Sequence, residues 1–191
     1  MKGKVLLVNI TVISCSLHPQ SRSYVLAQHV VADLKELGVK APLYDLRNQE
    51  LGMCDAVTTH KTPVAEEMIE AIREADSVLL SMPVYNYDVN TAAKNLLEIG
   101  MRAWNHKLVG FLCAAGGQRS YMSVMPFANS LMLDFRCIII PRFVYAVGSD
   151  FGDDRQPTMY VASSEIQNRI KELATNTVRL TKALSTVTFT S

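Results

Sequence analysis

Apolar runs recur along the chain, and an amphipathic stretch follows each of them. A run that is apolar nearly throughout is typical of a strand buried on both faces of a parallel sheet. The pattern predicts five such strands, at residues 4–13, 40–45, 77–81, 107–114 and 137–146.

Helices are predicted between the strands from apolar residues spaced three or four positions apart. The first covers residues 21–37 and stops at Gly38. The second begins with Thr62 as its cap and Pro63 in its first turn, and it ends at Asp76. Three further helices are predicted at residues 91–101, 122–136 and 164–184.

The remaining segments complete a regular alternation of strands and helices. Residues 46–62 show no strong period and are predicted as a loop, and the tail at residues 185–191 is predicted to fray. Ser164 and Gln167 are spaced as a capping box for the last helix. This order of elements specifies a doubly wound α/β domain with right-handed crossovers.

Three loops are predicted to converge at the carboxyl edge of this sheet, where doubly wound folds bind their ligands. They follow the first, third and fourth strands and contain residues 14–23, 83–87 and 115–118. The first offers hydroxyl groups, the second an aromatic and amide platform, and the third bare backbone that a flat ring can approach closely. The three loops are therefore the candidate binding site.

The first of these loops has the composition of a phosphate cradle, because it is rich in hydroxyls and opens a helix whose first N–H groups are free. Its polar side chains come from Ser14, Ser16, His18, Ser21, Arg22 and Ser23. The same residues also suit an ordinary loop in which Ser21 or Ser23 caps the helix, and that alternative stays open.

Other phosphate-binding motifs fit the chain poorly. It contains neither the G-x-G-x-x-G pattern of dinucleotide-binding folds nor the G-x-x-x-x-G-K-[ST] pattern of P-loop proteins. A tyrosine-phosphatase loop places five residues between its nucleophilic cysteine and its arginine, whereas six separate Cys15 from Arg22. The extra residue would turn the guanidinium away from the cradle, so a phosphatase is disfavoured.

Composition narrows the function classes further. A net charge of +1 without a basic cluster disfavours a nucleic-acid partner or a polybasic membrane role. The 191 residues and a hydrophobic content of 49% suit a single domain over residues 1–191. The four cysteines and four histidines lack metal-ligand spacing, so reduced thiols in a cytoplasmic protein are expected.

The start of the chain loosely resembles a lipoprotein signal, because two lysines precede an apolar stretch that ends at Cys15. Asn9 and Thr11 interrupt that stretch, and cleavage would remove the first strand. Export is therefore disfavoured, and no apolar run reaches the length of a membrane span.

Four motifs together resemble a known family. Residues 14–23, Ser-Cys-Ser-Leu-His-Pro-Gln-Ser-Arg-Ser, resemble its first-loop pattern of Ser-Gly-Ser-Leu-Arg and further serines. Residues 83–86, Pro-Val-Tyr-Asn, are followed by Lys94-Asn95 as in its most diagnostic motif. Asp45-Leu46-Arg47 and Gly116-Gly117 fit as well. The family is that of the NAD(P)H-dependent FMN reductases of flavodoxin-like fold, which includes quinone, azo-dye and chromate reductases, and the resemblance covers residues 4–184.

The resemblance implies a five-stranded parallel sheet of order 2-1-3-4-5, with FMN as cofactor and NAD(P)H as co-substrate. The FMN phosphate would be held by Ser16, His18, Ser21, Arg22 and Ser23. The isoalloxazine would lie along Pro83, Val84, Tyr85 and Asn86, and its pyrimidine edge would face Ala115, Gly116 and Gly117. Because the flavin carries the chemistry, no catalytic side chain and no metal is expected.

The family also implies partners for the reaction and for the chain. A small-molecule acceptor such as a flavin or quinone would take the electrons. A homodimer or homotetramer is implied, with the helices around Met101 and at residues 122–132 as its candidate surface.

The chain departs from the family pattern at several positions. Cys15 replaces a usual glycine, His18 a usual arginine, and Val84 a residue that is often acidic. Residues 88–92 lack the Pro-Gly pair that commonly opens the following helix. Two other functions therefore stay open. One is a flavodoxin-type electron carrier, which the net charge disfavours, and the other is a flavin-free binding or regulatory protein on the same fold.

Overall fold

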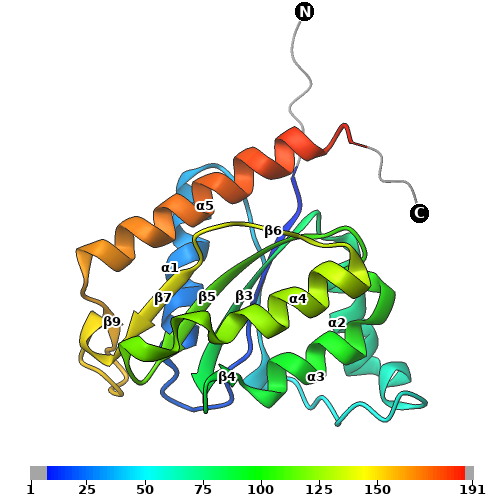
Figure 1. The fold of residues 1–191 in the computed structure, drawn as a ribbon, viewed down its shortest axis with the longest axis horizontal. Helices are drawn as coiled ribbons and strands as arrows, with labels where there is room; N and C mark the ends of the chain where they lie inside the picture. The colour runs from blue at the N-terminus through cyan, green and yellow to red at the C-terminus, as the bar shows by residue number, and fades with distance from the viewer. Residues whose placement is uncertain (1–7, 188–191) are drawn as a thin grey trace, which may run out of the picture.

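A computed structural model describes residues 8–187, and the predictions for residues 1–7 and 188–191 lie outside the described residues. A central sheet is covered by helices on both faces (Figure 1). The strands at its centre are β1 (Ile10–Ser14), β3 (Ser77–Tyr85) and β5 (Leu108–Ala115), which are buried over almost their whole length. The sheet thus has the two-sided cover that the apolar runs predict.

The sheet follows the order β2-β1-β3-β5-β6, and β7 also pairs with β5. The outer strands are β2 (Leu43–Asp45), β6 (Ile138–Ile139) and β7 (Val144–Val147), and all of these pairings are parallel. The short β4 (Asp88–Val89) pairs antiparallel with the end of β3. The predicted fold class is confirmed, and the predicted order changes only through the split fifth strand and the added β4.

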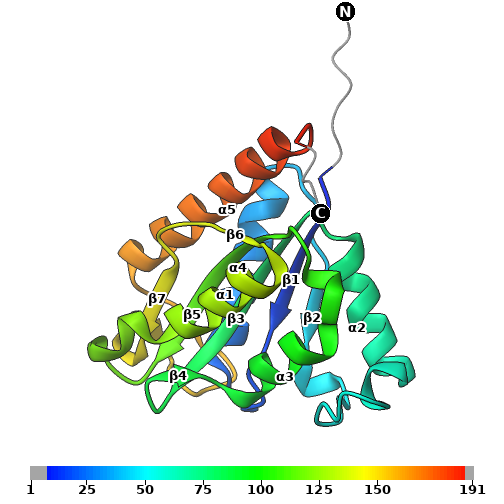
Figure 2. The same ribbon diagram turned by 45° about the vertical axis from the view of Figure 1, so that its right-hand side comes forward.

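Two groups of helices form the outer layers. On one face, α1 (Arg22–Glu36) and α5 (Ser164–Leu184) pack on a cluster that includes Leu26, Val30 and Leu173. The other face is covered by α2 (Pro63–Glu74), α3 (Thr91–Gly100) and α4 (Met125–Phe135). Figure 2 shows the sheet between the two layers. Among residues 8–187, no helix has both the length and the apolar character needed to cross a membrane.

Short elements fill the connections. Turns of 3-10 helix occur at Leu46–Asn48, Thr59–Lys61, Met101–Trp104, Gln118–Val124 and Gly148–Asp150. The strands β8 (Phe151–Gly152) and β9 (Tyr160–Val161) form a small hairpin that the sequence pattern does not predict.

The predicted fifth strand is broken, because Pro141 and Arg142 interrupt it. Arg142 has a φ of 58°, which a strand does not allow. Val109 pairs with Ile139, but Leu112 pairs with Val144, so two extra residues lie in the outer strand between the two pairings. The apolar run at residues 137–146 therefore looks like a single strand in the sequence, but its backbone forms two strands, β6 and β7.

The third strand is longer than predicted, because it continues through Pro83 to Tyr85. Proline is tolerated there because β1 has ended at Ser14, which is paired with Ser81, so no neighbouring strand needs the missing N–H. The strand then turns back through Asn86 and Tyr87, which have φ values of 52° and 61° as in a type I′ hairpin. The motif at residues 83–86 therefore lies on a strand end and a tight turn.

Helix ends follow the predictions except at the last two helices. Thr62 accepts a hydrogen bond from the N–H of Ala65, and Gly38 ends α1 with a φ of 78°. The predicted capping box at Ser164 is wrong, because the cap is Ser163, whose hydroxyl accepts from the N–H of Ile166. The predicted helix at 122–136 begins as 3-10 turns and becomes regular only at Met125.

Candidate functional site

A cleft of about 700 Å³ opens at the carboxyl edge of the sheet, between the three predicted loops. Ten of the twelve residues predicted to bind FMN line it. They are Ser16, Arg22, Ser23, Pro83, Val84, Tyr85, Asn86, Ala115, Gly116 and Gly117. The structure thus brings together residues that are up to 101 positions apart in the sequence, as Ser16 and Gly117 are.

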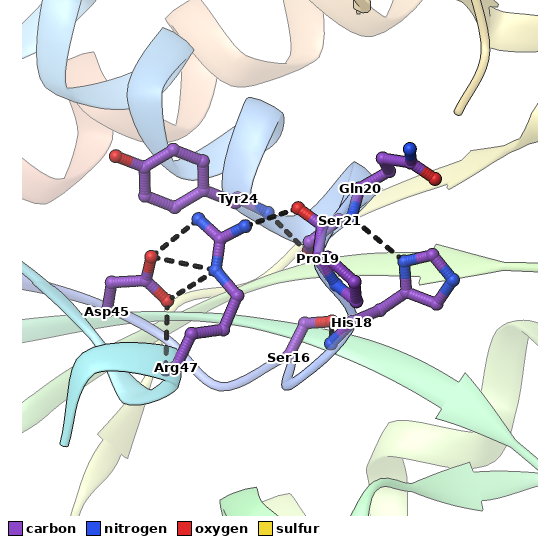
Figure 3. A network of polar contacts seen from close by, with 8 residues as sticks. All are labelled: Ser16, His18, Pro19, Gln20, Ser21, Tyr24, Asp45 and Arg47. Carbon is purple, nitrogen blue, oxygen red and sulfur yellow. Dashed lines mark hydrogen bonds and ion pairs between the residues drawn. The ribbon is translucent and has the colours of Figure 1, made fainter. Parts of the chain in front are cut away.

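Two predicted phosphate ligands, His18 and Ser21, lie outside the lining. The Nδ1 atom of His18 accepts a hydrogen bond from the N–H of Gln20 at 3.0 Å. The hydroxyl of Ser21 caps α1 by accepting from the N–H of Tyr24 at 3.0 Å. Both side chains shape the first loop, as Figure 3 shows.

Protein donors bind four carbonyl groups of the first loop and the start of α1. The side-chain amide of Asn90 donates to the carbonyl of Cys15 at 2.7 Å. Arg47 and Arg155 donate to the carbonyls of Pro19 and Gln20, each at 2.6 Å. The hydroxyl of Ser81 donates to the carbonyl of Ser23 at 2.6 Å.

In contrast to these bonded carbonyls, two of the first N–H groups of α1 have no acceptor among the described residues. The N–H of Tyr24 is taken by Ser21, and that of Val25 by the carbonyl of Ser21. Within residues 8–187, no acceptor takes the N–H of Arg22 or Ser23. With four carbonyls bonded and these two donors free, this segment presents positive polarity, which suits an anion.

Arg47 supports the first loop from the second strand. Its guanidinium pairs with the buried Asp45 through contacts of 2.5 to 3.0 Å and lies 4.3 Å from the ring centroid of Tyr24 (Figure 3). The Asp45 partner raises the pKa of Arg47, so its charge is permanent. The Asp45-Leu46-Arg47 motif therefore holds the first loop in place through the hydrogen bond from Arg47 to the carbonyl of Pro19.

Arg22 lines the cleft but is already paired. Its Nε and Nη2 atoms donate to the carboxylate of Asp154 at 2.8 and 2.5 Å, and Nη1 donates to the carbonyl of Ala115 at 3.4 Å. Gly148 leaves room for this guanidinium, since a Cβ there would lie 2.6 Å from Nη2. The sequence predicts a phosphate ligand here, and the structure shows that Arg22 links the first loop to β5 and to the segment after β8.

The second loop presents aromatic side chains at the rim. Tyr85 and Tyr87 are 49% and 69% exposed, although both line the cleft. Of the motif's two later residues, Lys94 pairs with Asp88. The side chain of Asn95 bonds the N–H of Cys54 and the carbonyl of Gly52 at 2.8 and 2.9 Å, so it anchors the loop before α2.

The third loop leaves open space above bare backbone. A Cβ on Gly116 or Gly117 would meet no atom within 4 Å. The hydroxyl of Tyr145 donates to the carbonyl of Gly117 at 2.5 Å and accepts from the N–H of Ser120 at 3.2 Å. Tyr145 thus fixes the loop while the glycines keep the cleft clear.

Sequence reasoning missed part of the lining. Tyr87 and Gln118 lie within the predicted loops but are not among the predicted FMN ligands, and the lining residues outside those loops are Ala114, Arg119, Ser120 and Arg155. Most directly adjoin the predicted segments, so wider loop limits would have found them. No motif in the sequence points to Arg155, because it lies in the segment after β8, far along the chain from the predicted loops.

Cys15 faces the core and not the cleft. It is fully buried in the cluster beneath α2 and α3, and burial raises its pKa well above the usual range. Burial likewise raises the pKa of Cys113 and of Cys137 to about 12. All four cysteines are free thiols, and none lines the cleft. Replacement of the family's usual glycine by Cys15 therefore leaves the site unobstructed.

A sequence profile of the NADPH-dependent FMN reductases matches residues 8–152, which is most of the chain and includes all three loops. The chain belongs to this family. It is therefore an oxidoreductase that uses FMN as cofactor and NAD(P)H as co-substrate.

Individual relatives agree with the family assignment. An NAD(P)H-dependent FAD/FMN reductase of Geobacillus thermodenitrificans is 23% identical over 164 residues, 84% of this chain and 86% of the relative. The NADH-dependent FMN reductase SfnF of Pseudomonas fluorescens is 28% identical over 137 residues, 70% of this chain and 73% of the relative. An oxidoreductase structure from Corynebacterium diphtheriae shares the fold, with a TM-score of 0.73, 21% identity, and coverage of 93% of this chain and 98% of that chain.

The cleft of this FMN reductase family member fits the cofactor. Its volume of about 700 Å³ suits a ligand of that size. Within residues 8–187, three arginines and no acidic residue line it, and the free N–H groups of Arg22 and Ser23 suit a phosphate. The space above Gly116 and Gly117 suits the edge of a flat ring.

Proposed function

We propose that the cleft binds FMN with its phosphate at the start of α1, its isoalloxazine along residues 83–86 and its pyrimidine edge at residues 115–117. One observation carries this proposal. Protein donors bind four carbonyls of the first loop and helix start, and two N–H groups of the helix start are left for an anion. An FMN phosphate carries close to two negative charges at neutral pH, which aligned N–H groups stabilise.

When bound, FMN supplies the hydride and electron chemistry that amino-acid side chains lack. The chain contributes binding and orientation. The lining residues in the described part of the chain include no carboxylate, histidine, lysine or cysteine. We therefore infer that no side chain acts as a general acid or base, and that hydroxyls of Ser16 and Ser23 with the nearby backbone hold the cofactor in place.

We infer that the electron acceptor is a flat aromatic molecule such as a second flavin or a quinone. The exposed rings of Tyr85 and Tyr87 stand at the mouth of the cleft, where they can stack on such a molecule. The mouth is open to solvent on this side, so donor and acceptor can use it in turn. This supports a ping-pong route.

A spectrum of the purified protein tests the proposal. The protein is mixed with FMN and desalted, and the absorbance of bound FMN should then remain. Anaerobic NADPH or NADH should bleach that absorbance.

A substitution in the third loop tests the position of the flavin. Gly117 has an extended backbone with open space above it, so Gly117→Val should keep the fold and weaken FMN binding at least tenfold by filling that space. Gly52→Val, on an exposed loop where a Cβ meets Thr59 at an ordinary 3.6 Å, is the control.

Two outcomes of this experiment count against the proposal. A protein that neither retains FMN nor oxidises either nicotinamide with a flavin or quinone would remove the proposed reaction. A Gly117→Val variant that binds FMN as tightly as the wild type would remove the proposed orientation of the flavin.

We also propose a homodimer, formed through the face that carries α3 and α4. Between these helices lies a groove of about 830 Å³ that contains Glu98, Arg102, Asp134 and Arg136. None of these four charges has an ion-pair partner within residues 8–187. A two-fold axis through the groove would place the acids of one copy against the bases of the other.

A cytoplasmic location completes the proposal. Four cysteines are free, and three of them are buried without a nearby partner thiol. Free thiols persist in a reducing compartment.

A further inference from the structure

Three arginines line the cleft, but they are not equivalent. Arg22 is held by Asp154, with its Nη2 atom 2.5 Å from the carboxylate. Arg155 donates to the carbonyl of Gln20 at 2.6 Å. Among residues 8–187, Arg119 has neither a hydrogen-bond acceptor nor an ion-pair partner for its guanidinium. Among the described residues, Arg119 is thus the cleft arginine whose guanidinium has no protein partner, whereas Arg155 uses its Nη1 atom on the carbonyl of Gln20.

The backbone that carries Arg119 is fixed although its side chain is exposed. Tyr145 binds both the carbonyl of Gly117 and the N–H of Ser120, which flank Gln118 and Arg119. Tyr121, two residues further on, stacks on Phe143 with ring centroids 4.5 Å apart. Arg119 therefore projects from a defined position on the rim, and binding a ligand costs it only side-chain entropy.

Arg119 lies in a different part of the cleft from the proposed FMN phosphate. The proposed FMN phosphate lies against the N–H groups of α1, at the end of the first loop, whereas Arg119 follows the third loop in the 3-10 segment Gln118–Val124. Among the residues that the structure describes, no carboxylate lines the cleft to neutralise Arg119. The donor's nicotinamide ring must enter the cleft, so its adenosine end lies toward the rim, where NADPH carries a 2′-phosphate that NADH lacks. A guanidinium is the side chain best suited to bind that phosphate through two parallel hydrogen bonds.

We propose that Arg119 binds the 2′-phosphate of NADPH and makes this protein prefer NADPH to NADH. The inference rests on the proposed function, because it takes the cleft as the place where FMN and the donor meet. It adds the residue that chooses between the two donors.

Binding of nucleotide fragments tests the assignment without turnover. Calorimetry on the FMN-loaded protein should show adenosine 2′,5′-bisphosphate binding roughly tenfold tighter than adenosine 5′-monophosphate, as expected for a hydrogen bond to a charged group. Arg119→Gln should abolish the difference by weakening only the bisphosphate. Arg179→Gln, at an exposed position on α5 outside the cleft, should leave the difference intact.

Steady-state kinetics give a second readout. Arg119→Gln should raise KM for NADPH about tenfold while KM for NADH and kcat stay unchanged. Equal weakening of both fragments, or of both donors, would assign Arg119 to the phosphates that the donors share and overturn the proposal.

The role of Arg119 and the proposed function can be tested separately. A wild type that retains FMN and uses both donors with equal efficiency would overturn the role of Arg119 and leave the proposed function standing. A wild type that does not retain FMN would remove the proposed function itself.

Discussion

Tyr145 holds the third loop of the cleft through a single hydroxyl group. The hydroxyl donates to the carbonyl of Gly117 and accepts from the N–H of Ser120, so it bonds the backbone at two points three residues apart. The ring stands on β7, next to β5 in the sheet. The loop that faces the proposed pyrimidine edge thus takes its position from the sheet.

We expect Tyr145→Phe to weaken FMN binding by up to about thirtyfold, because two backbone groups of the loop lose their partner, each worth about 1 kcal/mol. A fluorescence titration of FMN measures the change. Tyr44→Phe is the matched control, since no partner takes the Tyr44 hydroxyl within the described chain. Equal FMN affinity in both variants would show that the loop keeps its position without the hydroxyl.

At the scale of elements, Arg22 and Asp154 join the start of α1 to the segment after β8. Their side chains are 16% and 32% exposed, so solvent screens the pair only in part. The Arg22 guanidinium lowers the pKa of the Asp154 carboxyl below its ordinary value. A lowered pKa in the folded state means that the pair stabilises the fold above about pH 4, the value of a free aspartate, and that this stabilisation fades as pH falls further.

Asp154→Asn should therefore cost roughly 1 to 2 kcal/mol of unfolding free energy at pH 6 and progressively less below pH 4. Urea unfolding at pH 6 and pH 3.5 measures the difference from the wild type. Glu172→Gln, which removes the more exposed pair with Arg142, should show a smaller loss at both values. A loss for Asp154→Asn that is the same at both pH values would contradict the assignment.

The predicted elements are those whose signals are local. Burial on both faces reveals β1, β3 and β5, and the cap at Thr62 and the stop at Gly38 mark helix ends, because each depends on neighbouring residues. Ser163 and Ser164 offer the same cap chemistry, so one residue of error was unavoidable. Pro83 ends a strand in most contexts, and only the early end of β1 lets it stay in one.

The sequence predicts which loops form the site, but it does not predict which side chains pair with one another across those loops. The motifs identify the segments that line the cleft, because parallel strands bring their carboxyl ends to one edge. The partner of Arg22 is 132 residues away, and Arg155 reaches Gln20 across 135 residues. Such pairings depend on how distant loops pack, so spacing within a motif could not show that Arg22 is occupied and Arg119 is free.

At the scale of the whole molecule, the two helical layers differ in what they expose. Large exposed apolar side chains on or beside α3 and α4 include Met101, Met122, Met125, Met132 and Leu133. Met101 lines the groove that contains Glu98, Arg102, Asp134 and Arg136, and Met132 and Leu133 belong to α4, which contributes Ser130 and Asp134 to the same groove. An apolar patch with self-complementary charges inside it is the pattern of an interface between identical copies.

The wild type should therefore sediment at twice the chain mass of 21.2 kDa. Leu133 is 76% exposed, so Leu133→Glu should leave the monomer folded and shift the assembly to one chain, because the dimer would bury a carboxylate without a partner. Leu37→Glu is the control on the opposite layer, where Leu37 caps α1 and is 41% exposed. Sedimentation velocity over a range of concentrations separates the outcomes. A Leu133→Glu variant that stays dimeric would place the interface elsewhere, and a monomeric wild type would show that the exposed methionines serve another purpose.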